Sequence, residues 1–295
     1  MKTLGIGRQI AISNVLFATD FSPHSDAALP YARAIAHQYG ATLFGAHVLS
    51  ADDYVYLSPE VWPTQFDQEK ETREKVITRL EDQLHGIPHQ ALSGTGNVSS
   101  VLQRLVIEHD IDLIVVGSHG RTGARKLLMG SVAETIFRQA RCPVLTVGPR
   151  VMDQKKTVAE LNHILFATDF GEQASTAASY AISLAREHQA RLSLLHVLER
   201  THPGAKSPEP AVDSLFQLLR ELVPLDTELI SHPEYFIQFG LATERILQFS
   251  CAHEVDLIVM GVHPHDVVSA VTHLAHTTAQ EIVARANCPV LTVHD

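Results

Sequence analysis

The feature that most constrains this chain is a repeat, because three blocks of the first half recur in the same order in the second half. The heptapeptide VLFATDF at residues 15–21 returns as ILFATDF at residues 164–170. The other two blocks are DLIV, at residues 112–115 and 256–259, and CPVLTV, at residues 142–147 and 288–293. One shared block can arise by chance, but three in order indicate a duplication. The fold predicted for one half therefore applies to the other.

The boundary between the repeats is predicted in residues 148–160, which read GPRVMDQKKTVAE. This stretch is polar, begins with a Gly-Pro break and separates two periodic regions. The predicted domains are residues 1–150 and 157–295 of the 295 residues in the chain. Because the linker is short, we expect the two domains to pack against each other.

Each half alternates short apolar runs with helical patterns, which predicts a parallel sheet covered on both faces. Expected strands lie near residues 15–18, 42–49, 89–92, 113–116 and 144–147, and near 163–167, 191–198, 235–239, 257–260 and 290–293. Expected helices lie near residues 68–84, 98–109 and 132–139, and near 172–188, 211–222, 242–253 and 270–285. Another helix should begin after Ser22 as N-cap and be kinked at Pro30. The predicted fold class is α/β, with two tandem, open, doubly wound, five-stranded parallel sheets.

Composition excludes several classes of protein. No run of about 18 uncharged apolar residues is present, so we expect no membrane insertion. The first residues lack a signal-peptide core, which favours a cytoplasmic location. The formal net charge of −10 argues against a nucleic-acid surface, and three cysteines provide no disulfide framework.

The segment after the fourth expected strand has the residues of a phosphate-binding loop. Residues 117–131 read GSHGRTGARKLLMGS, and ligands of such sheets bind beyond the carboxyl ends of the strands. Gly117 and Gly120 permit positive φ and close approach of the backbone. Gly130 and Ser131 place N–H groups at a helix start, where an anion is favoured. Arg121 adds positive charge, so we predict a phosphate cradle here.

The spacing Gly-x2-Gly-x9-Gly-Ser after strand four, with Thr-Asp-Phe ending strand one, resembles the signature of the universal stress protein superfamily. The resemblance covers essentially the whole chain, twice. It implies an adenine-nucleotide α-hydrolase-like fold, and ATP with Mg²⁺ or Mn²⁺ as ligands. It also implies a regulatory or stress-resistance role with at most weak ATP hydrolysis. The fifth strands of the two halves should pair as an intramolecular pseudo-dimer, and a homodimer of whole chains stays open.

The resemblance assigns roles to individual residues of the first half. Ala18, Thr19 and Asp20 should meet the adenosine end of ATP, and the backbone of Val48 should read the adenine edge. Val116 and Gly117 should lie by the ribose. The phosphates should be held by His119, Gly120, Arg121, Gly130, Ser131 and Val132. Taken alone, Asp20 is equally well explained as a carboxylate at a helix N-terminus.

The second half departs from this pattern. The tetrapeptide GSHG becomes GVHP at residues 261–264, and Pro264 has neither an N–H to donate nor a free φ. Gly130-Ser131 aligns with His276-Thr277, so a side chain fills the approach to the phosphates. We therefore predict that the second half does not bind ATP in the family manner.

Four histidines near this altered loop suggest a metal site, and they are His263, His265, His273 and His276. Neutral imidazoles bind Zn²⁺, and the last two are three residues apart on one helix face. Ordinary polar loop histidines are the simpler interpretation, because nothing in the sequence shows that the four converge. A small-ligand or metal-binding scaffold formed by the second domain therefore stays open.

An enzyme, a slow nucleotide hydrolase or transferase, is the second alternative. It would need a substrate site in addition to the loop, and residues 50–66, with Tyr54, Tyr56 and Trp62, could cover one. The same segment is also explained as a packing loop. The sequence shows no nucleophile–base pair and no base directed at a water, so no catalytic residue is predicted.

Overall fold

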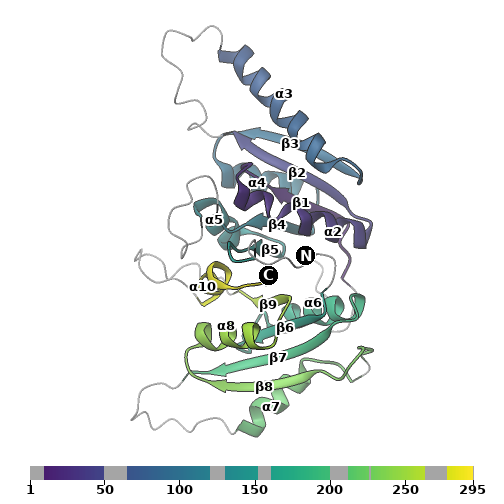
Figure 1. Cartoon of the computed structure of the whole chain (residues 1–295), viewed down its shortest axis with the longest axis vertical. Coiled ribbons are helices and arrows are strands. Elements are labelled where there is room, and N and C mark those ends of the chain that lie inside the picture. Colours follow the sequence, from purple (N-terminus) through teal and green to yellow (C-terminus); the bar gives the residue numbers. More distant parts are fainter. Residues whose placement is uncertain are drawn as a thin grey trace.

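The computed structural model describes residues 10–49, 65–119, 130–151, 161–199, 212–225, 227–262 and 278–294 (Figure 1). Strands of the first half are β1 (Asn14–Ala18), β2 (Thr42–Leu49), β3 (His89–Thr95), β4 (Leu113–Gly117) and β5 (Val144–Val147). Its helices are α1 (Pro23–Asp26), α2 (Leu29–Tyr39), α3 (Gln65–Leu84), α4 (Val98–Glu108) and α5 (Ser131–Gln139).

The second half repeats this order of elements. Its strands are β6 (His163–Thr168), β7 (Arg191–Leu198), β8 (Glu234–Phe239), β9 (Leu257–Gly261) and β10 (Val290–Val293). Its helices are α6 (Ala174–Glu187), α7 (Val212–Glu221), α8 (Ala242–Ala252) and α10 (Thr278–Arg285). Residues 270–277 of the helix expected near 270–285 lie outside the described part of the chain.

All ten strands form one sheet, in the order β3-β2-β1-β4-β5-β10-β9-β6-β7-β8. Pairing is parallel within each half, and β5 meets β10 antiparallel with Leu145 opposite Leu291. The predicted fold class and the pairing of the two fifth strands are therefore confirmed. This pairing also leaves neither fifth strand as an open edge. The predicted domain limits stay a prediction, because residues 1–9 and 152–160 fall outside the description.

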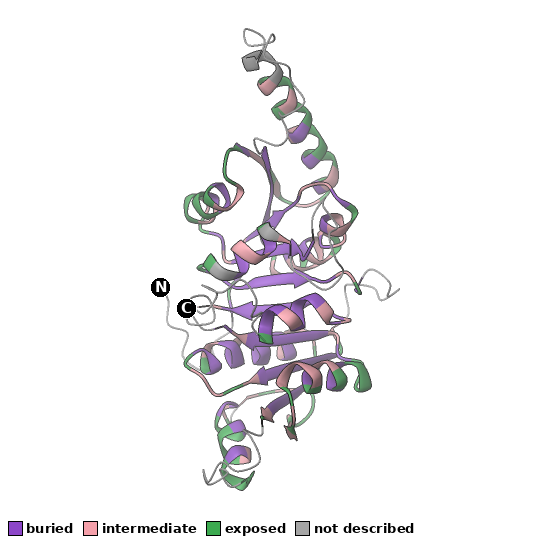
Figure 2. Cartoon of the chain, turned by 90° about the vertical axis from the view of Figure 1, so that its left-hand side faces the viewer, coloured by how far each residue is buried: buried purple, intermediate pink, exposed green. Residues whose placement is uncertain are grey.

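One hydrophobic core runs across both halves on one face of the sheet. It joins α2 and α6 to inward-facing residues of both sets of strands, among them Phe17 and Phe166. The opposite face has two further cores, one under α4 and α5 and one under α8 and α10, and the second also includes Phe137 of α5. Figure 2 shows the buried strands as a continuous band through the middle of the molecule. The two halves therefore share the core of one face.

The helix expected to be kinked at Pro30 is in fact two helices. Ser22 caps α1 as predicted, accepting from the backbone N–H of Ser25 at 3.2 Å. Helix α1 ends at Asp26, and Pro30 lies in the first turn of α2. The missing N–H of proline costs nothing there, because the first turn of a helix has no intrahelical acceptor for it. A break replaces the expected kink.

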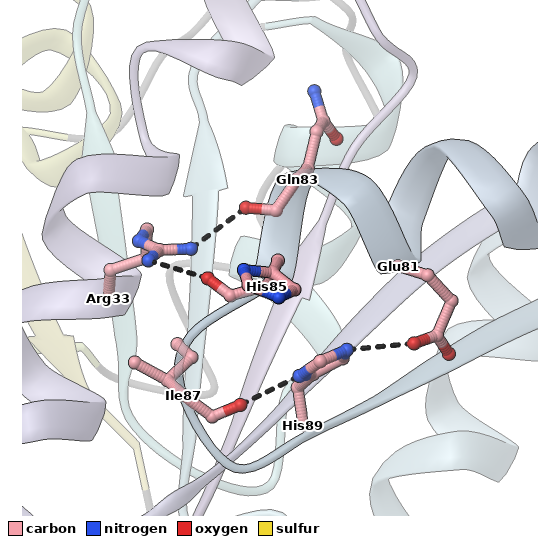
Figure 3. Close-up of polar contacts among 6 residues, drawn as sticks. All are labelled: Arg33, Glu81, Gln83, His85, Ile87 and His89. Atoms are coloured by element: carbon pink, nitrogen blue, oxygen red, sulfur yellow. Dashed lines mark hydrogen bonds and ion pairs between the residues drawn. The ribbon is translucent and has the colours of Figure 1, made fainter.

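Helix α3 reaches beyond the sheet in Figure 1 and is fixed to the fold at its C-terminal end. The guanidinium of Arg33 donates to the carbonyl oxygens of Gln83, at 2.9 Å, and His85, at 3.0 Å (Figure 3). Gln83 lies in the last turn of α3 and His85 follows its end, where carbonyl oxygens receive no hydrogen bond from an N–H of the helix. His89 then joins the carbonyl of Ile87 to the carboxylate of Glu81. None of the described helices is long and apolar enough to cross a membrane.

Candidate functional site

The switch point of the first half lies between β1 and β4, the neighbouring strands at the centre of its order β3-β2-β1-β4-β5. Ala18, at the end of β1, is paired with Val116, near the end of β4. Both side chains are buried. Two of the residues predicted for the nucleotide site are therefore neighbours at the edge where ligands of doubly wound sheets bind.

The residues after Ala18 form a tight turn built on their own side chains. The hydroxyl of Thr19 accepts from the backbone N–H of Phe21 at 2.9 Å, and Oδ1 of Asp20 accepts from that of Ser22 at 3.0 Å. Phe21 has a φ of 60°, the left-handed region that costs most residues energy. The Thr19 hydroxyl also lies 2.9 Å from that of buried Ser25. Asp20 is therefore placed at the switch point by a local turn.

Two residues that the sequence did not assign to the site complete this turn. His47 of β2 is buried and donates through Nδ1 to the carbonyl oxygen of Thr19 at 2.8 Å. Its ring stacks on Phe21, with the ring centroids 4.7 Å apart. The guanidinium of Arg79, from α3, lies 4.1 Å from the centroid of the same phenyl ring. The recurrence of His47-Val48-Leu49 as His196-Val197-Leu198 shows that both halves keep this histidine, but it does not report the contact with the turn.

The second half contains the same turn. Thr168 accepts from the N–H of Phe170 at 3.0 Å, and Oδ1 of Asp169 accepts from that of Gly171 at 2.8 Å. Phe170 has a φ of 62°. His196 donates to the carbonyl of Thr168 at 2.9 Å, and its ring centroid lies 4.5 Å from that of Phe170. The Thr-Asp-Phe turn is therefore a structural unit present in both halves.

Gly117, which was predicted to lie by the ribose, ends β4 beside α1. Its φ is not positive, and a Cβ placed on it would lie 2.5 Å from the backbone oxygen of His24 and 2.9 Å from the Cα of Ser25. Helix α1 therefore takes the space that a side chain would need. Gly261 in the second half is constrained likewise, with Gln173 atoms at 2.7 and 3.3 Å. The close neighbour of Gly117 is thus a helix of the protein itself, and its place beside the ribose stays a prediction.

The described end of the loop connects β4 to α5. Gly130, the N-cap of α5, donates from its backbone to the carbonyl of Ser118 at 2.8 Å. Gly130 has no side chain with which to cap α5, so the backbone N–H groups in the first turn of α5 receive no hydrogen bond from the N-cap residue. His119 is buried, and its Nδ1 lies 2.9 Å from the hydroxyl of Ser118. The start of α5 is thus held directly against the end of β4.

The remaining predicted residues are only partly described. Val48 is buried in β2, where it is paired with Gly94 of β3, and Val132 is partly exposed in the first turn of α5. The predicted residues outside the description are Gly120, Arg121, His263, His265, His273 and His276, together with the side chain of Ser131 and the segment 50–64. The described ranges hold no group of three or more metal-binding side chains. The zinc site stays a prediction.

Comparison with known proteins gives a consistent result for both halves. A sequence model described as the universal stress protein family matches residues 11–148 and again residues 160–294. Universal stress protein A homolog 1 of Coxiella burnetii is 33% identical over 138 residues, which cover 45% of this chain and 94% of that protein. A universal stress protein of Methanocaldococcus jannaschii is 28% identical over 136 residues, covering 45% of this chain and 80% of the relative.

A solved structure resembles the whole chain. The crystal structure of a universal stress protein from Archaeoglobus fulgidus aligns with a TM-score of 0.74 at 18% identity. The alignment covers 95% of this chain and 98% of the other. At 18% identity the similarity shows the fold alone. The aligned region spans both halves and the joint between them.

Proposed function

This chain belongs to the universal stress protein family, and from that membership we propose that it is a regulatory or stress-resistance protein whose first half alone binds ATP. One observation carries the proposal. The N-terminus of α5 is tied to the end of β4 by the 2.8 Å bond from Gly130 to Ser118, next to the strand that leads into Thr19 and Asp20. A helix start and a carboxylate turn therefore lie at one switch point.

The residues fit the two ends of a nucleotide separately. Asp20 and the backbone of Val48 lie at the ends of adjacent strands, where they would take the adenosine. The start of α5 would take the phosphates, since its N–H groups and dipole favour an anion even in an acidic protein. Gly120 and Arg121 are proposed to complete the cradle. Mg²⁺ or Mn²⁺ would bridge the phosphate oxygens rather than enter a site made only of protein atoms.

The second half keeps the turn but lacks the predicted phosphate cradle. Asp169 accepts the same backbone hydrogen bond as Asp20, so the turn alone does not distinguish the two halves. The distinction lies in the sequence after β9, where Pro264 replaces a glycine and His276 takes the position of Gly130. We therefore assign a single ATP site, in the first half, to each chain.

Isothermal titration of the whole chain with MgATP tests this assignment, using Asp20→Asn and Asp169→Asn as a matched pair. Asparagine keeps the Oδ1 acceptor of the turn in either half but removes the charge. Asp20→Asn should weaken ATP binding about ten-fold, the size expected for losing a hydrogen bond to a charged group. Asp169→Asn should leave the affinity unchanged.

A further variant tests the phosphate end. Gly130 has a φ of −66° and a ψ of 152°, which any residue adopts, so Gly130→His should fold normally. Because it puts the second-half residue at the start of α5, ATP binding should be lost. Two ATP molecules per chain, or equal losses from Asp20→Asn and Asp169→Asn, would refute the assignment to the first half.

The same samples separate binding from enzymatic turnover. A binding protein should release phosphate or pyrophosphate much more slowly than the roughly 1 s⁻¹ at the lower end of typical enzymes. Steady-state release above that rate, lost in Gly130→His, would favour the nucleotide hydrolase or transferase instead.

A further inference from the structure

A cavity of about 190 Å³ lies over the joint between the halves, away from the candidate nucleotide site. Its floor includes Leu145 and Leu291, which face each other across the β5–β10 pair. Its walls include residues of α2 and α6, on the face of the sheet that has the shared core. Pairs related by the repeat line it, among them Tyr31 and Tyr180, Leu113 and Leu257, and Leu145 and Leu291. The cavity exists only because the two halves are joined.

The two tyrosines give this apolar cavity a polar element. Tyr31 and Tyr180 are half-buried, and neither hydroxyl makes a hydrogen bond within the part of the chain that the structure describes. By contrast, the hydroxyl of Tyr39, also on the lining, donates to the carboxylate of Glu187. The two tyrosines therefore offer hydrogen bonds to a molecule inside the cavity.

The charges near the tyrosines determine what kind of molecule that is. Burial, and then Cys288 and Asp256, raise the pKa of Tyr31 to about 12. Burial, and then Cys142 and Asp112, raise the pKa of Tyr180 to about 12. Both hydroxyls are therefore neutral donors at pH 7. The carboxylates of Asp256 and Asp112, which disfavour tyrosinate, also disfavour an anionic ligand.

The volume limits the size of the molecule. A dry engineered cavity of about 150 Å³, lined by apolar side chains, takes up benzene. A cavity of 190 Å³ has room for one or two aromatic rings. His188 on its lining has a pKa lowered by burial, so this imidazole adds no positive charge at pH 7.

We propose that the cavity over the β5–β10 joint binds a small, neutral, mostly apolar molecule of one or two rings that bears a hydroxyl or a similar hydrogen-bonding group. Tyr31 or Tyr180 bonds to that group, and the leucines pack against the rings. Since the lining comes from both halves, the bound molecule stabilises the joint by mass action. The second ligand class of this protein would then act on how the two domains are held together.

Titration of the whole chain with 1-naphthol, naphthalene and 1-naphthoate at pH 7 tests the proposal. We expect saturable binding of 1-naphthol, with an accompanying rise in Tm. Naphthalene should bind about five-fold more weakly, the factor that one net hydrogen bond provides. The anion 1-naphthoate should bind at least ten-fold more weakly than 1-naphthol. Tighter binding of 1-naphthoate than of 1-naphthol would overturn the charge argument and with it the proposal.

Two sets of variants locate the binding. The double variant Tyr31→Phe/Tyr180→Phe keeps both rings, so it should lose about five-fold in affinity for 1-naphthol and none for naphthalene. Ala34→Trp adds a large side chain on the lining and should abolish binding of both compounds. Phenylalanine is close to tyrosine in shape, so the double variant remains informative if Ala34→Trp does not fold. Unchanged 1-naphthol affinity in the double variant, or in a folded Ala34→Trp protein, would reject the site.

Discussion

The turns after β1 and β6 have the same hydrogen bonds, although we propose a nucleotide for only one of them. Asp20 and Asp169 accept from the backbone two residues ahead, and His47 and His196 each hold the carbonyl before that aspartate. A motif that is equally complete in both halves does not decide which half binds a ligand. The deciding residues have to be sought where the halves differ.

The helices that follow these turns show one such difference. In the first half, Pro30 lies in the first turn of α2 and a four-residue α1 precedes it. In the second half, α6 runs without a break from Ala174 to Glu187. Only the first half therefore has the pair Ser22 and Ser25 beside its turn, where Ser25 contacts the hydroxyl of Thr19. The second turn has Gly171 and Ala174 at these two positions, so it has no serine hydroxyls there.

The largest expected effect tests whether the two halves unfold independently of each other. Phe17 and Phe166 occupy equivalent places in the one core that crosses the joint, and both are fully buried. Phe17→Ala and Phe166→Ala should each lower the free energy of unfolding by about 4 kcal/mol. Because the core is shared, calorimetry should show a single transition that moves down in either variant. Two transitions, of which each variant moves only one, would show that the halves unfold independently.

A second effect distinguishes the halves by how acid changes their contributions to stability. Burial lowers the pKa of His294 from 6.5 to about 4, and its equivalent in the first half is Gly148. The pKa of His294 is lower in the folded protein than in the unfolded chain, so neutral His294 favours the folded state. Its contribution to the free energy of unfolding is complete above pH 6.5 and is lost as the pH falls towards 4. The loss should reach about 3 kcal/mol.

Chemical denaturation of the wild type and His294→Leu between pH 7.5 and 4 measures this loss. The variant should have a flatter profile, and the remaining slope should come from groups such as His163 and His188, whose pKa values burial also lowers. Identical profiles for the two proteins would mean that His294 is not kept neutral by burial.

The third effect concerns the glycines that end β4 and β9. A methyl group on Gly117 would meet the backbone of α1 at 2.5 Å, and one on Gly261 would meet the Cβ of Gln173 at 2.7 Å. Gly117→Ala and Gly261→Ala should each destabilise the protein by about 2 kcal/mol, since a helix has to move. Only Gly117→Ala should also weaken ATP binding, because α1 contacts the Thr19 turn. Equal ATP affinity in the two variants would remove the link between that packing and the site.

The sequence predicted the fold more completely than the site, and the glycine after β4 shows why. Repeat and alternation depend on local patterns, so the order of strands and helices along the chain could be predicted, whereas the pairing of β5 with β10 was implied by the family resemblance. Gly117 was predicted from its place in a loop motif, but its neighbour in the structure is His24, on a helix whose position depends on packing. His47 reaches Thr19 across two paired strands, and no spacing along the chain reports such a contact. Site residues are positioned by contacts of this long-range kind.

The smallest effect comes from the first half and has the opposite sign to that of His294. The bond from His89 to the carbonyl of Ile87, and then the Glu81 carboxylate, raise the pKa of His89 above 6.5 (Figure 3). Protonated His89 therefore stabilises the folded protein. This contribution to the free energy of unfolding is complete below pH 6.5 and is lost as the pH rises through the folded pKa. Glu81 is half exposed, so solvent screening limits the effect to a few tenths of a kcal/mol. NMR titration should give a pKa of His89 above 6.5 in the wild type. In Glu81→Gln the pKa of His89 should be lower. A pKa below 6.5 in the wild type would show that only buried histidines, such as those of the second half, shape the response to pH.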